Sequence, residues 1–156
     1  MRFLILLLIL TGCASAPKFD TTQVDQSLTP QAVLADPAQA RDKFVLWGGT
    51  ILDTRNLADS TQIQLLAYPL NSSQRPDANL QPLGRIIVRQ PGYLEPTSYA
   101  PGRLLTVFGR VGDTQQGNVG EASYTYPVVI AEKLELWSQG STSSQSSFHF
   151  GIGIGF

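Results

Sequence analysis

The sequence is poor in the residues on which most catalytic and metal sites depend. Its 156 residues include a single cysteine and a single histidine. One cysteine excludes an internal disulfide framework and a metal site built on several thiolates. The chain also contains no His-Glu-x-x-His, Cys-x-x-Cys, Gly-x-Ser-x-Gly, P-loop or calcium-loop motif. We therefore expect no bound metal, no cofactor and no catalytic residue, and the chain is not expected to be an enzyme.

Charge is scarce and nearly balanced. Lys and Arg number 11, Asp and Glu number 12, and charged residues make up 15% of the chain, against roughly 25% in an average soluble domain. A nucleic-acid-binding protein needs a concentration of positive charge. The composition therefore predicts no nucleic-acid partner.

Long apolar runs are missing as well. The run from Phe3 to Leu10 follows Arg2 and falls short of the roughly 20 residues that a membrane-spanning helix needs. A basic residue, an apolar core and small residues in this order are typical of a secretory signal. The segment Leu10-Thr11-Gly12-Cys13 resembles the bacterial lipobox, and the only cysteine falls at its last position. We predict cleavage before Cys13 and acylation of that residue.

Acyl chains on Cys13 would hold the mature chain on a bilayer without a transmembrane segment, because each buried methylene contributes about 0.8 kcal/mol. Ala14 follows the cysteine where retention in the inner membrane would favour Asp, so we expect export to the outer membrane. We expect the domain on its periplasmic face, although Ala14 does not decide between that face and the cell surface. Loss of Arg2 with the signal leaves 10 basic and 12 acidic residues, a net charge of −2. We therefore expect attachment through lipid rather than through charge.

Composition divides the chain into four parts. Residues 1–12 are the expected signal peptide, 13–28 a polar lipidated tether, 29–137 a β domain and 138–156 a flexible tail rich in Ser and Gly. At the end of the tail, residues 148–156 alternate strictly between apolar residues and Gly or His. Interfacial association and a strand donated to a partner stay open for this segment, while pairing with its own sheet or disorder is favoured.

Two helical turns are expected before the period of the pattern changes to two. Thr29-Pro30 and Asp36-Pro37 each pair an N-cap residue with a proline at the first helical position, which predicts turns near 30–35 and 37–42. Alternation typical of strands follows. The five predicted strands are 44–52, 61–68, 83–89, 103–111 and 126–137. Gly48-Gly49 suggests a bulge or bend in the first strand.

Short strands without intervening helical patterns favour an all-β domain. We predict a small antiparallel barrel of five to six strands, OB-like because it resembles the oligonucleotide/oligosaccharide-binding type, since closure limits exposed edges. A two-sheet sandwich is the competing architecture. In the last strand, Val128, Ile130, Leu134 and Leu136 are expected to share one face.

Aromatic and acidic side chains near strand ends are the candidates for contact with a ligand. Glu95 and Glu121 could form the carboxylate pair of a glycosidase, although hydrogen bonds to turn amides or pairing with arginines is favoured. The aromatic residues could stack on a sugar or meet a lipid headgroup, although closing the ends of a small core is favoured. The predicted contact patch consists of Trp47, Tyr93, Glu95, Tyr99, Glu121 and Tyr124.

An ordered series of motifs resembles the Slp family, the starvation-inducible outer-membrane lipoproteins of Gram-negative bacteria. The series includes Trp47-Gly48-Gly49, Tyr68-Pro69-Leu70, Gly92-Tyr93-Leu94-Glu95-Pro96, Pro101-Gly102-Arg103 and Tyr126-Pro127-Val128-Val129. With the lipobox, the resemblance covers about residues 1–137. It implies a palmitoylated outer-membrane lipoprotein that supports the envelope in starvation or stationary phase. No catalytic residue or cofactor comes with it, and Cys13 is the only family site that transfers.

The expected function is that of a non-catalytic structural or interaction module of the envelope. Its expected partners are outer-membrane lipid, through the acyl chains on Cys13, and envelope proteins or glycans. The alternative is a periplasmic binding module for a glycan, a peptidoglycan fragment or a lipid.

Overall fold

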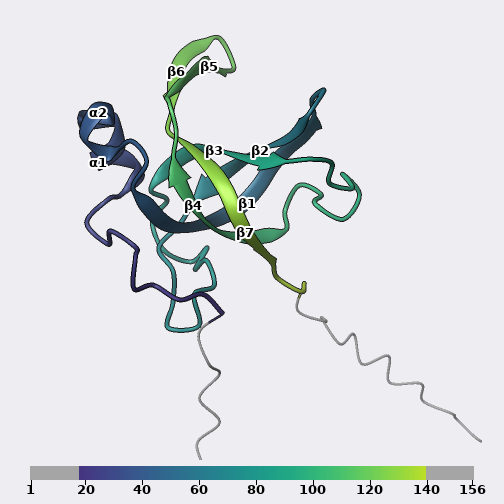
Figure 1. Cartoon of the computed structure of the whole chain (residues 1–156). Helices are drawn as coiled ribbons and strands as arrows, with labels where there is room; N and C mark the ends of the chain where they lie inside the picture. Colours follow the sequence, from purple (N-terminus) through teal and green to yellow (C-terminus); the bar gives the residue numbers. More distant parts are fainter. Residues whose placement is uncertain (1–17, 140–156) are drawn as a thin grey trace, which may run out of the picture.

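The computed structural model describes residues 18–139 (Figure 1). Within that range the chain forms two short helices followed by seven strands. The predicted signal peptide, Cys13 and the alternating segment 148–156 lie outside the described residues.

Both predicted helical turns are confirmed. Helix α1 (Pro30–Ala35) is capped by Thr29, whose Oγ1 accepts a hydrogen bond from the amide of Ala32 at 3.1 Å. Helix α2 (Pro37–Ala40) is capped in the same way by Asp36, which accepts from the amide of Gln39 at 3.1 Å. Each helix begins at a proline, where no backbone donor is lost because the first amides of a helix have no intrahelical partner.

Five strands close into a barrel in the order β1-β2-β3-β7-β4, with β4 pairing back to β1. The strands are β1 (Phe44–Asn56), β2 (Ser60–Ala67), β3 (Gly84–Pro91), β4 (Leu104–Val111) and β7 (Val128–Leu136). All neighbouring pairs are antiparallel except β3 and β7. The predicted all-β barrel of five to six strands is therefore confirmed, with one parallel pair at its seam.

Side chains fill the interior of the barrel. Residues at alternate positions of the strands are fully buried: Ile63, Leu65, Ile86, Val88, Leu105 and Val107 have exposures of 0%. Val33 of α1 is equally buried and belongs to the same cluster. The helical segment therefore contributes to the core of the barrel.

A polar hairpin that the sequence did not predict stands between β4 and β7. Its strands are β5 (Gln115–Val119) and β6 (Ala122–Tyr126), which form a separate two-stranded sheet. The hairpin projects from the barrel at the top of Figure 1. At its foot, Tyr126 packs with Ile87 and Val128 in a second apolar cluster. The hairpin therefore covers part of the outer face of β3.

The prediction that the apolar residues of the last strand share one face is wrong for the first half of that strand. Val129 and Ala131 are the buried members of the main core, whereas Val128 and Ile130 belong to the second cluster. The register against β4 then shifts between Phe108 and Gly109, which leaves Glu132 as an extra residue. Such a bulge reverses the facing of the residues that follow, so Leu134 and Leu136 pack against the main core.

Glycines let neighbouring strands approach closely. A Cβ on Gly49 would lie 2.1 Å from the carbonyl oxygen of Leu66, so no side chain fits there. The irregularity of β1 lies between Ile51 and Asp53, beyond the glycine pair where the bulge was expected. Gly49 therefore provides space for β2 rather than a bulge in β1.

Candidate functional site

The first described residues run along the wall of the barrel, and we call residues 18–28 the strap. Phe19 is 4% exposed. Its amide donates to Oε1 of Gln74 at 2.8 Å, and Nε2 of Gln74 donates back to the carbonyl of Phe19 at 2.9 Å. Lys18 forms an ion pair with Glu135, and Val24 forms a parallel bridge with Phe44. From Lys18 onward, the segment expected to be a tether is thus attached to the domain.

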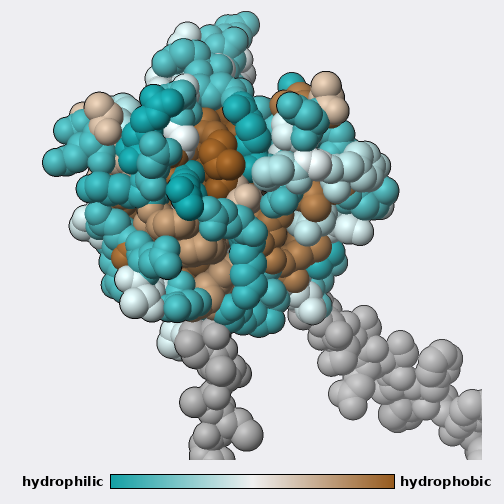
Figure 2. Space-filling model, in the orientation of Figure 1, coloured by the Kyte–Doolittle hydropathy of each residue, from teal (hydrophilic) through white to brown (hydrophobic). Residues whose placement is uncertain are grey.

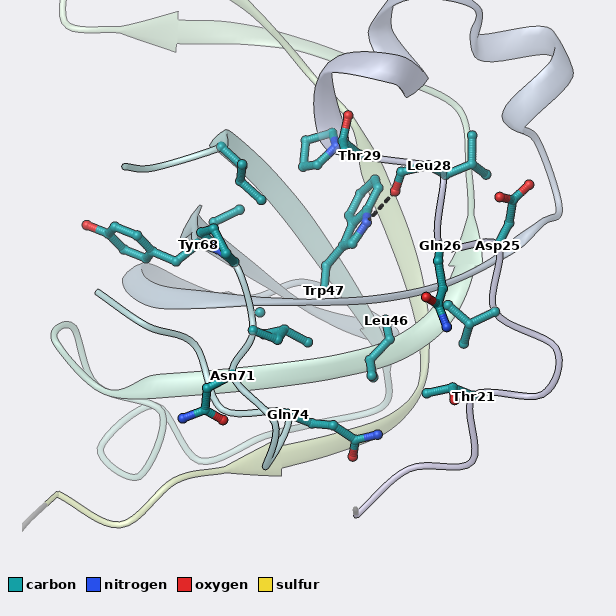
Figure 3. Close-up of a pocket in the computed structure, with 17 residues that line it drawn as sticks. Thr21, Asp25, Gln26, Leu28, Thr29, Leu46, Trp47, Tyr68, Asn71 and Gln74 are labelled. Carbon is teal, nitrogen blue, oxygen red and sulfur yellow. Dashed lines mark hydrogen bonds between the residues drawn. The ribbon is translucent and has the colours of Figure 1, made fainter. Parts of the chain in front are cut away.

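A hollow of about 420 Å³ lies between the strap and the loop that joins β2 to β3 (Figure 3). We call it the strap groove. Its volume falls within the roughly 300–1,000 Å³ of small-molecule sites. Its apolar lining consists of Val24, Leu28, Pro30, Leu46, Trp47, Ala67, Tyr68, Pro69, Leu70 and Leu83. Polar side chains, among them Asp25, Asn71 and Gln74, complete the lining.

Trp47 joins the barrel to the end of the strap. Its side chain lies on β1 and is part of the main core, with 7% exposure. The indole Nε1 donates a hydrogen bond to the carbonyl of Leu28 at 2.8 Å, drawn as a dashed line in Figure 3. Trp47 therefore fixes the inner wall of the groove and satisfies a strap carbonyl at the same time.

Hydrogen bonds also hold the opposite rim of the groove. Oδ1 of Asn71 accepts from the amides of Ser73 and Arg75, at 2.9 and 3.1 Å. The carbonyl of Gln74 accepts from Oγ1 of Thr106 on β4 at 2.8 Å. Both rims of the groove are therefore tied to the barrel.

The strap side of the groove carries a stabilised negative charge. Asp25 accepts hydrogen bonds from the hydroxyl and the amide of Ser27, at 2.5 and 3.1 Å, and lies 3.5 Å from Nζ of Lys43. The bonds from Ser27, and then the charge of Lys43, lower the pKa of Asp25 below its ordinary value. Asp20 has a lowered pKa as well, because Thr22 donates to it in the same manner. Asp25 is therefore ionised at neutral pH.

Three of the predicted contact residues share the loop between β3 and β4. The hydroxyl of Tyr93 donates to Oε2 of Glu95 at 3.3 Å, and the amide of Tyr99 donates to the carbonyl of Glu95 at 3.1 Å. Oε1 of Glu95 also accepts from the hydroxyl of Thr97 at 3.0 Å. Glu95 thus holds a turn, as the sequence favoured, while Tyr93 is 70% exposed.

The other predicted contact residues lie elsewhere. Glu121 is exposed at the turn of the β5–β6 hairpin. The hydroxyl of Tyr124 accepts a hydrogen bond from the amide of Arg85 at 3.1 Å, which fastens the hairpin to β3. Trp47 lines the strap groove. The six residues therefore fall in three separate parts of the fold.

The sequence did not identify the strap as part of the site. Its residues are mostly polar and show no period, which is typical of a tether. The one feature of the sequence that could have indicated its attachment is the presence of isolated apolar residues in an otherwise polar stretch: Phe19, Val24 and Leu28. Of these, Phe19 is buried, and Leu28 packs against the main core.

The described part of the chain holds neither a metal-binding cluster nor a helix suited to a bilayer. Between residues 18 and 139, no group of three or more His, Cys, Asp or Glu residues is placed to hold a metal ion. None of the helices in the same range is long and apolar enough to cross a membrane.

A family model and several known proteins match this chain over most of its length. A family model described as the outer membrane lipoprotein Slp family matches residues 10–152. A Haemophilus influenzae protein described as uncharacterized is 35% identical over 134 residues, which are 85% of this chain and 73% of that protein. The outer membrane protein Slp of Escherichia coli is 26% identical over 131 residues, 83% of this chain and 69% of that protein. An uncharacterized E. coli lipoprotein, YeaY, is 28% identical over 134 residues, 83% of this chain and 67% of that protein.

Proposed function

The chain belongs to the outer membrane lipoprotein Slp family, and from this premise we propose that it is a non-catalytic structural and interaction module of the envelope. Acyl chains on Cys13 hold it at the periplasmic face of the outer membrane, and it supports the envelope in starvation or stationary phase. The observation that carries the proposal is the attachment of the strap to the barrel from Lys18 onward.

The attached strap limits the distance between the domain and Cys13. Only five residue steps separate Cys13 from Lys18, and at about 3.3–3.6 Å per residue they span at most about 18 Å. A tether that continued to residue 28 would let the barrel move freely over the membrane surface. The attached strap instead supports a domain that stays next to the bilayer to which Cys13 is anchored.

The described side chains support contact rather than catalysis. Aliphatic residues with exposures of 0–1% fill the barrel, and hydrogen bonds within its own loop occupy Glu95. The strap groove, by contrast, opens at the surface and has room for a ligand. An interaction at the surface of the domain therefore fits the fold better than a reaction inside it.

Replacing Cys13 by Ala tests the anchor. We expect the Cys13→Ala chain to move from the outer-membrane fraction to the soluble periplasmic fraction, because the acyl chains are its only proposed attachment. Ser15→Ala, two residues further along, is the matched control and should stay with the membrane. Unchanged membrane retention of the Cys13→Ala chain would contradict lipid anchoring, as would an unmodified thiol in the mass spectrum of the mature protein.

A second candidate function is the binding of one acyl chain of a lipid in the strap groove. The favouring observation is the groove itself, an apolar hollow of about 420 Å³ with a polar rim. The short segment between Cys13 and the strap keeps the groove within reach of the bilayer, where acyl chains are concentrated. This second function is a specific form of the alternative named above, a periplasmic binding module, with a lipid as its ligand.

Fluorescence of parinaric acid, a naturally fluorescent fatty acid, tests this second function on the unacylated Cys13→Ala chain. Leu46→Glu should weaken binding at least about tenfold, because it places a charge in the apolar groove. Leu57→Glu is the matched control, since Leu57 is 45% exposed just beyond the end of β1. Equal binding by the two variants would exclude the groove as the site.

A further inference from the structure

A second hollow lies where the end of α2 meets β3, β4 and β7, and its lining includes three arginines and two aspartates. Its volume is about 350 Å³. The charged residues that line it are Arg41, Asp42, Arg89, Arg110 and Asp113, and the apolar residues are Val111, Gly112, Val128 and Ile130. We call it the arginine cleft. None of these arginines belongs to the strap groove or to the predicted contact patch.

The barrel register places two of the arginines on either side of an apolar floor. Arg89 of β3 pairs with Ile130 of β7, and Arg110 of β4 pairs with the same Ile130. Residues in one row across neighbouring strands share a face of the sheet, and strands lie about 4.8 Å apart. The Cα atoms of Arg89 and Arg110 are therefore about 10 Å apart, with Ile130 between them.

The third arginine comes from the end of α2. The amide of Asp42 donates to the carbonyl of Val111 at 2.9 Å, which fixes Arg41 next to the end of β4. Nη1 of Arg41 lies 2.7 Å from Asp113, and both side chains are more than half exposed. Arg110 pairs with Glu132 at 2.9 Å and is also about half exposed. Exposed ion pairs of this kind contribute little, so an anion in the cleft can compete for both arginines.

Arg89 differs from the other two arginines because no carboxylate pairs with it in the described residues. Its Nη2 donates to the neutral amide oxygen of Gln115 at 3.0 Å. Its Nε is buried and has no hydrogen-bond partner among the described residues. A buried donor without a partner is costly. Arg103 also has such an Nε, but both of its terminal nitrogens donate to backbone carbonyls.

We propose that the arginine cleft binds the carboxylate of a short peptide that ends in a small apolar residue. A carboxylate matches the planar guanidinium fork of Arg89, whose one side-chain hydrogen bond among the described residues is to the neutral Gln115. The side chain next to the carboxylate then rests on Ile130, which is partly exposed above the buried Val128. Figure 2 shows apolar side chains exposed at the foot of the hairpin between hydrophilic neighbours. A bare inorganic anion would leave this apolar floor unused.

The test uses the lipidated mature chain in micelles of an uncharged detergent. Proton–nitrogen NMR observes the Nε–H groups of arginine directly. The probes are acetyl-Ala-Ala, its C-terminal amide, acetate and inorganic phosphate. We expect acetyl-Ala-Ala to shift the Nε–H signal of Arg89 at lower concentration than acetate or phosphate, and the amide to leave it unchanged. Binding of the amide as tight as that of the acid would overturn the proposal, as would phosphate or acetate binding as tightly as the peptide.

Two variants on the same strand complete the experiment. Arg89→Gln should weaken binding of acetyl-Ala-Ala at least about tenfold, because a charge-assisted bidentate contact is lost. Arg85→Gln is the matched control: Arg85 also lies on β3 but outside the cleft, and its backbone contact with Tyr124 does not involve the side chain. Backbone spectra establish that both variants are folded. Equal affinity of the two folded variants would exclude Arg89 as the binding residue.

Discussion

At the scale of single residues, polar groups determine how the strap lies on the barrel. Trp47 donates to Leu28, Gln74 exchanges two hydrogen bonds with Phe19, and Lys18 pairs with Glu135. Each of these contacts joins residues far apart in the sequence. The attachment of the strap is therefore a product of the tertiary fold and not of local sequence.

The pKa of Asp25 gives a prediction at this scale. Because the folded chain stabilises the carboxylate through Ser27 and Lys43, its pKa should lie below the ordinary 3.8. The stabilisation is fully present above the unfolded pKa and is lost as the pH falls through the lower, folded value. Ser27→Ala should raise the pKa of Asp25 toward 3.8 in an NMR titration.

Thr22→Ala is the control for that titration. Thr22 donates to Asp20 and not to Asp25, so this substitution should raise the pKa of Asp20 and leave Asp25 unchanged. A pKa of Asp25 that does not respond to Ser27→Ala would contradict the assigned cause.

Individual residues were predictable only where local rules apply. The caps Thr29 and Asp36 follow from their position before proline, and both are confirmed. Trp47 was favoured as a side chain that closes the end of the core, and its low exposure fits that interpretation. The unpartnered Nε of Arg89 depends on which strands meet around it, and no local pattern encodes that.

At the scale of elements, the distance between neighbouring strand backbones determines which side chains the barrel can accommodate. Gly49→Ala should destabilise the protein by about 3 kcal/mol or more, since the new Cβ would meet the backbone of β2, which cannot move aside without distorting the sheet. Urea unfolding followed by circular dichroism measures the change in the free energy of unfolding.

Gly112→Ala provides the comparison for Gly49→Ala. A Cβ on Gly112 would lie 3.3 Å from Cδ1 of Ile130, the end of a side chain. We expect a loss of about 1 kcal/mol or less. If the two variants lost the same stability, the close approach of β1 and β2 at Gly49 would not be a constraint.

Period-two alternation located all five barrel strands but not the hairpin. Residues 115–126 are largely polar, because β5 and β6 form a two-stranded sheet outside the barrel. The bulge at Glu132 had a visible signal, since this acidic residue interrupts an apolar pattern. Its effect was not predictable, because a bulge is defined by the partner strand and β4 was not known to be that partner.

At the scale of the whole molecule, we expect the strap to open more readily than the barrel, because it lacks the strand ladders that close the barrel. Phe19→Ala should release the strap, because it removes a buried ring over which Nζ of Lys133 lies at 5.1 Å from the centroid. Hydrogen exchange at the amide of Asp25, which donates to Phe44, should speed up, while amides of β2 and β3 keep their protection.

Leu57→Ala is the control for the release of the strap, because Leu57 is 45% exposed and lies outside the strap. Its exchange pattern should match that of the unmodified chain. If Phe19→Ala left the amide of Asp25 as protected as before, the strap would not depend on its buried aromatic anchor.

Barrel closure was predictable from the number of short strands, and a closed ring of five strands must contain at least one parallel pair, because alternating directions need an even number. That β3 and β7 form this pair was not predictable. Alternation shows which face of a strand is buried and says nothing about the direction of its neighbour. The antiparallel pairs β1–β2, β2–β3, β1–β4 and β4–β7 give β3 and β7 the same direction, so the pair that closes the ring between them is parallel.

The two hydrogen bonds between Phe19 and Gln74 also decide where mechanical load enters the domain. If Cys13 anchors the chain as proposed, tension on it would reach the strap first, where side-chain contacts and the backbone hydrogen bond from Asp25 to Phe44 resist it. The hydrogen-bonded ladders of the barrel lie behind them. Under increasing force we therefore expect the strap to detach before any barrel strand separates, which would leave the folded core intact.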